Sequence, residues 1–178
     1  MPISHIGLNT PDINSLSAFY LAVLSPLGYK EKMSFMDGKV RGYGGVCEPD
    51  FWLSSLDSRP EELKKETGPL HLAFAARTRN QVRAFYDAAL YVALFVLQCF
   101  KIDIHLRKAG ATCNGPPGLR PQYFMTYYAA FVIDPEGRNI EAVCMKPGFW
   151  AEEWSWGVWT AVVGLTGVGV GALWNYVL

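Results

Sequence analysis

The chain has 178 residues, with 16 basic and 16 acidic side chains, so its formal net charge is +0. It is long enough to bury a core as one compact domain or as two small halves. The balanced charge argues against a nucleic-acid-binding protein, which needs a basic surface to neutralise phosphates. The N-terminus carries no basic stretch or apolar signal core, and the four cysteines form no C-x-x-C pair. Both features favour a reducing, cytoplasmic compartment.

The first part of the chain predicts a β-α-β-β-β unit over residues 3–56. Short apolar runs bounded by turn residues are typical of strands, and apolar residues at helical spacing between two such runs predict a helix. An Asp37-Gly38 pair is typical of a hairpin turn between two of the strands. The predicted elements are, in chain order, a strand at 3–9, a helix at 14–24, and strands at 29–35, 39–46 and 51–55.

A second unit of the same plan is predicted over residues 69–146, after a polar linker at 57–68. Residues 114–121 are rich in glycine and proline, which predicts a loop there. The predicted elements are a strand at 70–76, a helix at 80–90, and strands at 111–113, 127–133 and 139–145.

An internal repeat supports this division into two modules. The sequence HIGLNTPDINSLSAFYLAVL, which begins at His5, returns without a gap 66 positions later as HLAFAARTRNQVRAFYDAAL, which begins at His71. Copies of one unit usually pack together. Each copy begins with a histidine, so the duplication brings two potential metal ligands towards one shared centre.

The second copy contains an apparent insertion near residues 91–107, of about sixteen residues by the register of the repeat. Its apolar half is too short to cross a bilayer, which needs about 20 apolar residues. The insertion either extends the second helix or forms an added element. A third interpretation is that it derives from unspliced or wrongly predicted coding sequence.

The C-terminal segment 154–178 contains no charged residue across its 25 positions. Tryptophans near both of its ends are typical of the interfacial aromatic belts of membrane helices, and 158–178 is long enough to cross a bilayer. Its glycines dilute the hydrophobicity. We therefore expect an apolar helix here, either a membrane anchor or a helix docked on the sheet.

Three side chains form a candidate metal site. His5 and His71 occupy equivalent positions of the repeat, and Glu141 alternates with apolar residues in a predicted strand. A carboxylate in such a strand is costly to bury unless it is paired or binds a metal. Two imidazoles and one carboxylate on one face suit a divalent ion and leave coordination positions open for a substrate.

The paired histidine strands, the repeated A-F-Y helices and the segment D134-P-E-G-R-N-I-E141 resemble the vicinal oxygen chelate superfamily, which includes glyoxalase, bleomycin-resistance and extradiol-dioxygenase proteins. The resemblance implies an α+β fold of two tandem βαβββ modules, over residues 1–148, whose mixed sheets form a cup around a metal. It implies His5, His71 and Glu141 as ligands of a divalent ion, which is iron, zinc, manganese or nickel in such sites. It also leaves a homodimer open, because related modules pair within one chain or between two.

One position departs from the glyoxalase pattern. Trp52 aligns with Glu141 and cannot supply the fourth protein ligand of glyoxalase-type sites, which favours a three-ligand site with Trp52 as a pocket wall. Further residues are predicted to line the cup with Trp52, an arginine among them holding an anionic group of the substrate. These are Arg41, Tyr43, Arg120, Tyr123, Tyr127 and Tyr128.

Two functions compete. The first is a metal-dependent enzyme (a lyase, isomerase or dioxygenase) that acts on a small substrate through two adjacent oxygens; its general base is not identifiable. The second is a metal-free module of the bleomycin-resistance type that binds a small ligand in the same cup.

Overall fold

The computed structural model describes residues 3–46, 48–100 and 110–152. It contains two four-stranded mixed sheets, each with one parallel pair and two antiparallel pairs. The strand order is β1-β4-β3-β2 in the first sheet and β5-β8-β7-β6 in the second. The predicted α+β fold of two βαβββ modules is confirmed. The strands are β1 (Ile6–Thr10), β2 (Lys30–Phe35), β3 (Val40–Gly44), β4 (Phe51–Ser55), β5 (His71–Ala75), β6 (Thr112–Leu119), β7 (Tyr128–Ile133) and β8 (Asn139–Cys144).

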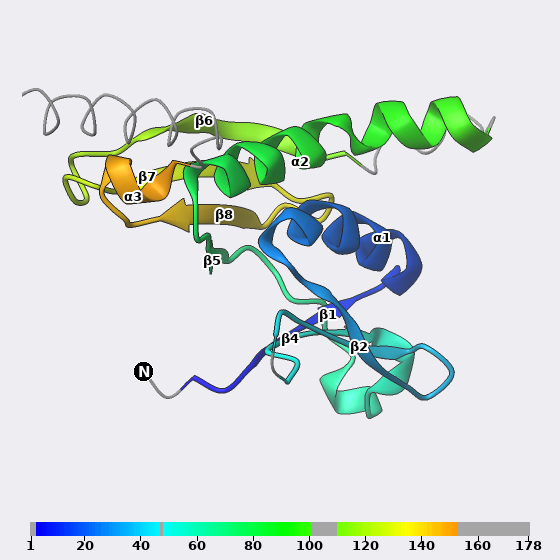
Figure 1. Cartoon of the computed structure of the whole chain (residues 1–178). Coiled ribbons are helices and arrows are strands. Elements are labelled where there is room, and N and C mark those ends of the chain that lie inside the picture. Colours follow the sequence, from blue (N-terminus) through cyan, green and yellow to red (C-terminus); the bar gives the residue numbers. More distant parts are fainter. Residues whose placement is uncertain (1–2, 47, 101–109, 153–178) are drawn as a thin grey trace, which may run out of the picture.

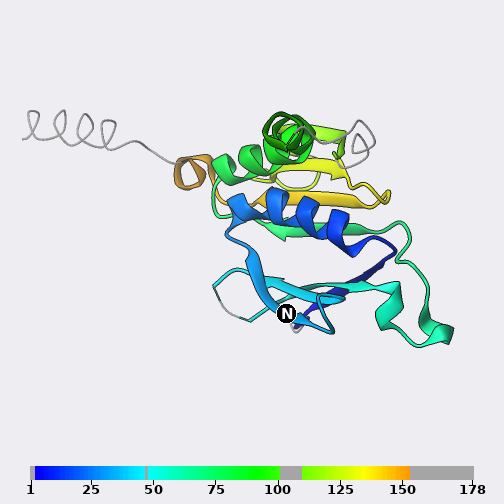
Figure 2. The ribbon, with the colours of Figure 1, turned by 90° about the vertical axis from the view of Figure 1, so that its right-hand side faces the viewer.

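Each module has one long helix between its first and second strands. Helix α1 (Ile13–Leu24) begins after Asp12, whose carboxylate accepts a hydrogen bond from the Ser15 amide and so caps the helix. Helix α2 (Arg79–Phe100) packs against β6, β7 and β8 and also contacts α1. In both views of the chain, α1 lies between the two sheets (Figures 1 and 2).

The strands of each sheet place alternate residues on two different faces. In the first sheet Leu8, Phe51 and Leu53 are buried on the face that packs against α1. Gly7 and Trp52, which pair across β1 and β4, lie on the other face, which we call the open face. In the second sheet we use the same name, open face, for the face that carries His71 and Glu141.

A buried polar network joins the two modules. The Arg138 side chain is 0% exposed. Its Nη1 donates to Asp134 at 3.0 Å, its Nε to the Thr67 carbonyl at 2.9 Å, and its Nη2 to the Asn9 carbonyl at 3.2 Å. The Tyr20 hydroxyl of α1 donates to the same Asp134 carboxylate at 2.9 Å. Burial, together with the nearby Asp134 charge, raises the pKa of Tyr20 well above its ordinary value.

Two elements are longer than predicted. Helix α2 continues through Phe100 instead of ending near Leu90, so the first part of the apparent insertion extends the second helix. Strand β6 continues through Leu119, where a loop was expected. That expectation was wrong because β6 is an edge strand with two register irregularities, a position in which prolines without an N–H are tolerated.

The prediction of a transmembrane helix is contradicted. None of the helices in the described ranges is long and apolar enough to cross a membrane. Although α2 has 22 residues, its first half carries Arg79, Arg83 and Asp87, which are costly in a bilayer. The segment 154–178, on which the prediction depended, lies outside the described residues, as does 101–109.

We expect Gly28→Ala to lower the free energy of unfolding by about 1 kcal/mol, because an L-residue is disfavoured in a left-handed conformation. Gly28 ends the short 3-10 helix Ser25–Leu27 with φ +90°, and an added Cβ would meet nothing within 4 Å. Gly68→Ala is a matched control, since it too has open space but no positive φ. Urea denaturation of both variants measures the difference, and equal stabilities would contradict the prediction.

Candidate functional site

The open face of the second sheet brings His71 and Glu141 together. The register pairs Ala73 of β5 with Glu141 of β8, so His71, two residues before Ala73, lies diagonally across from Glu141 on the same face. His71 Nε2 is 2.8 Å from Glu141 Oε2. The hydroxyl of Tyr127, which directly precedes β7, donates to Glu141 Oε1 at 2.6 Å. Burial, with this bond to Glu141, raises the pKa of Tyr127 to about 12, so the hydroxyl stays protonated as a donor.

In the part of the chain that the structure describes, the buried Glu141 carboxylate has no strong cationic partner. Its side chain is 1% exposed, whereas that of His71 is 53% exposed and reaches the open face. Its ion-pair partner among the described residues is the His71 imidazole, not an arginine or lysine. An ionised carboxylate with so little exposure is costly unless a cation compensates it.

These two side chains fit part of a metal site. Nitrogen and carboxylate oxygen donors together suit a divalent transition ion. His71 Nε2 and Glu141 Oε2, 2.8 Å apart, are close enough for one ion to bind both. Tyr127 would act as the outer hydrogen-bond partner that orients the carboxylate.

His71, Glu141 and Tyr127 form a cluster on the open face, and within the single chain His5 lies outside this cluster. It is exposed, precedes β1 in the other module, and has Ser4 Oγ at 3.2 Å from its Nδ1. It lines a hollow of about 180 Å³ whose wall includes the β5 residues Leu72 to Ala75. In the parts of the chain that the structure describes, no group of three His, Cys, Asp or Glu side chains is placed to hold a metal.

Trp52 occupies the position in the first module that Glu141 occupies in the second. Trp52 pairs with Gly7 of β1, and Glu141 pairs with Ala73 of β5; Gly7 and Ala73 are equivalent in the repeat. The first module therefore contributes an indole where the second contributes a carboxylate.

Comparisons with solved structures identify proteins of similar fold. A glyoxalase/bleomycin resistance protein from Albidiferax ferrireducens T118 is 25% identical, with a TM-score of 0.54, over 81% of this chain and 98% of that one. A glyoxalase/bleomycin resistance protein/dioxygenase family enzyme from Burkholderia phytofirmans PsJN is 20% identical, with a TM-score of 0.54, over 82% of this chain and 100% of that one. The resemblance to the vicinal oxygen chelate superfamily is confirmed.

A third structure, a lactoylglutathione lyase from Agrobacterium tumefaciens, is 15% identical, with a TM-score of 0.50, over 83% of this chain and 94% of that one. At that identity the likeness concerns the fold. No family model matches the sequence, and the search of curated proteins found no match.

Two of the predicted pocket residues lie beside the cluster in this vicinal oxygen chelate fold. The Arg120 guanidinium lies 5.7 Å from the centre of the Phe131 ring, and Phe131 meets the His71 ring edge-on at 6.1 Å. The Tyr123 ring packs edge-on against Tyr127 at 5.3 Å.

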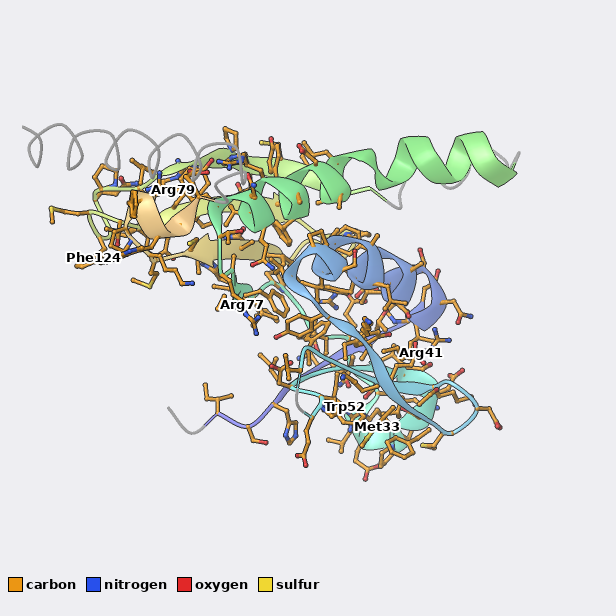
Figure 3. The ribbon with its side chains drawn as sticks, viewed as in Figure 1. Met33, Arg41, Trp52, Arg77, Arg79 and Phe124 are labelled. Atoms are coloured by element: carbon orange, nitrogen blue, oxygen red, sulfur yellow. The ribbon has the colours of Figure 1, made fainter. Side chains whose placement is uncertain are left out.

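Three other predicted pocket residues point towards the helices. Arg41 donates to Ser17 and Asn14 of α1, and the Tyr43 hydroxyl donates to Ser17 at 2.7 Å. Burial raises the pKa of Tyr43. Figure 3 shows Arg41 on the side of the first sheet that faces α1, with Trp52 and Met33 on the other side. Tyr128 accepts a hydrogen bond from Arg83 of α2.

Successive side chains of a strand point to opposite faces, which explains why some predicted pocket residues lie beside the cluster and others face the helices. Tyr127 and Tyr128 are adjacent, so they lie on opposite faces, and Tyr43 is one residue from Gly42, which pairs with Trp52 on the open face. Counting from Glu141 along the hairpin would have selected Tyr127 and Phe131. Arg59 also reaches the open face of the first sheet; it was not predicted from the sequence because it lies beyond the end of β4.

Proposed function

We propose that this protein is a metal-dependent enzyme of the vicinal oxygen chelate type, a lyase, isomerase or dioxygenase acting on a small substrate through two adjacent oxygens. The observation that carries the proposal is the buried Glu141 carboxylate, 2.8 Å from the exposed His71 imidazole and without an arginine or lysine partner among the described residues. A divalent ion held there would act as a Lewis acid towards the oxygens of the substrate.

The third ligand in this proposal is His5 of a second copy. The strand orders leave β1 and β5 at the edges of their sheets, and each edge presents unpaired backbone groups. His5 and His71 stand at the start of these two edge strands. A symmetric homodimer that sets β1 of one copy beside β5 of the other would bring both histidines and Glu141 to one centre, twice per dimer.

The other residues have supporting roles. The Tyr127 hydroxyl holds one carboxylate oxygen of Glu141, which leaves the other oxygen directed at His71. Arg120, held over the Phe131 ring by donation to the carbonyl of Pro116 at 2.7 Å, provides positive charge near the substrate. Trp52 forms an apolar wall in place of a fourth ligand.

Elemental analysis of the purified full-length chain tests the proposal. We expect close to one divalent ion per chain in the wild type, and loss of most of it in His71→Ala and Glu141→Ala, because each removes a ligand. Glu31→Ala, which removes an exposed carboxylate of β2, is the control and should retain the ion. A metal-free wild type that binds small ligands would overturn the proposal in favour of the metal-free binding module.

A further inference from the structure

The open face of the first sheet contains a hollow of about 650 Å³ that we call the Trp52 hollow. Its floor consists of residues that the register places on one face of β1, β3 and β4, and its rim comes from the hairpin after β2 and the segment after β4. The residues that line it are His5, Gly7, Phe35, Met36, Val40, Trp52, Ser54, Ser58 and Arg59.

The Trp52 indole lies flat on the floor of this hollow. Gly42 pairs with Trp52 across β3 and β4, and a Cβ on Gly42 would lie 2.8 Å from the indole ring atoms. The absence of a side chain at Gly42 therefore lets the ring lie against the backbone. The Phe35 ring is nearly parallel to the indole, at an angle of 11° with 6.1 Å between ring centres. The two rings therefore stack with an offset, and both line the hollow.

The rim supplies a positive charge without a carboxylate partner. Arg59 Nε donates to the Asn9 amide oxygen at 3.0 Å, and its Nη2 donates to the Ser54 hydroxyl at 3.2 Å. Both acceptors are neutral, and none of the ion pairs in the described residues includes Arg59. The described residues that line the hollow include His5 but neither Asp nor Glu. The guanidinium is thus positioned by two hydrogen bonds while its charge is left for a ligand.

The positions of the Trp52 ring and of the Arg59 charge indicate what kind of ligand the hollow binds. Ser54 follows Trp52 by two residues on the same face of β4, a separation of about 7 Å. Arg59 is anchored to Ser54, so its guanidinium is held at the next same-face position along β4 from Trp52.

We propose that the Trp52 hollow binds a planar aromatic anion of the aryl carboxylate class. The aromatic ring stacks on the Trp52 indole, and the carboxylate accepts hydrogen bonds from Arg59. As the substrate subsite of the enzyme this assignment rests on the function proposed above. As a binding site it depends on Trp52, Gly42 and Arg59, none of which is a metal ligand, so the two proposals can fail separately.

Isothermal titration of the full chain with three probes tests the proposal. The probes are 2-naphthoate, the neutral 2-naphthalenemethanol and the non-aromatic cyclohexanecarboxylate. We expect 2-naphthoate to bind most tightly, about two- to fivefold more tightly than the neutral probe, because a partly exposed ion pair adds a modest free energy. Equal binding of all three probes, or no binding of 2-naphthoate at millimolar concentration, would overturn the proposal.

Four variants assign the binding to these residues. Trp52→Leu and Gly42→Ala should each weaken both aromatic probes about tenfold, because they remove or displace the stacking surface. Arg59→Gln should reduce the preference for 2-naphthoate over the neutral probe and leave the neutral probe unchanged. Trp150→Leu replaces an exposed tryptophan of the second module and should bind as the wild type does. Wild-type affinity in Trp52→Leu would contradict the assignment.

The same titration with Glu141→Ala separates this proposal from the metal proposal. Loss of metal with retained 2-naphthoate binding supports both proposals. Retained metal in Glu141→Ala overturns the metal site alone, and a wild type that holds metal but ignores 2-naphthoate overturns the aryl carboxylate site alone.

Discussion

Replacing Arg138 by leucine is expected to lower the free energy of unfolding by about 3–5 kcal/mol, because it leaves a buried carboxylate without its cation. The Arg138 side chain is 0% exposed, and so is that of Asp134. The substitution also removes the donors to the carbonyls of Thr67 and Asn9, which lie in the linker and the first module. The loss therefore affects the packing between modules as well as the hairpin that contains Arg138.

Chemical denaturation followed by circular dichroism measures this loss. Arg120→Leu is the control, because Arg120 is partly exposed and lacks a carboxylate partner among the described residues, so its removal should cost less than about 1 kcal/mol. Equal stability of the two variants would show that the Arg138 network contributes nothing beyond surface contacts. Should Arg138→Leu fail to fold, Arg138→Lys keeps the charge but loses the forked geometry and should show a smaller loss in the same direction.

Two metal-deficient variants are expected to regain metal when their chains are mixed. In the proposed homodimer each site takes His5 from one copy, and His71 and Glu141 from the other. A mixed dimer of His5→Ala and Glu141→Ala therefore has one intact site and one doubly defective site. With equal amounts and random pairing, half of the dimers are mixed, so the metal content should recover to about one quarter of that of the wild type.

The experiment requires unfolding and refolding the two chains together, followed by elemental analysis and sedimentation to measure the mass. Each variant refolded alone is the control and should stay metal-deficient. Metal-deficient mixed dimers would contradict ligands shared between copies. A purely monomeric wild type that holds one ion would also contradict ligands shared between copies, because His5 would then have to reach Glu141 within one chain.

The candidate site was predictable where it depends on neighbouring strands. His71 begins β5, and Glu141 lies in β8, its direct parallel partner. Hydrophobic alternation places Glu141 on one face, and the repeat identifies His71 as the start of a strand. The remaining pocket residues needed the phase of each strand, because a shift of one residue moves a side chain to the other face. Tyr127 and Tyr128 illustrate this: the first contacts Glu141 and the second contacts Arg83 of α2.

The segment D134-P-E-G-R-N-I-E141 shows how one motif divides between two roles. Asp134 and Arg138 form the buried network that holds the second module against the first, whereas Glu141 belongs to the candidate metal site. Spacing alone does not separate these roles, since all three residues are charged and lie within eight positions. The contacts separate them, because Arg138 reaches back to Asn9 and Glu141 faces His71.

Three features could be read from the amino-acid sequence: the two βαβββ modules, the strand positions of His71 and Glu141, and Trp52 as the counterpart of Glu141. These follow from local periodicity and from the repeat, which depend on neighbouring residues in the chain. Three others became visible only in the folded chain: His5 lies apart from His71 and Glu141, Arg41 and Tyr43 face α1, and Arg59 and Trp52 line one hollow. Contacts between modules and between sheet edges depend on long-range packing, which local periodicity does not encode.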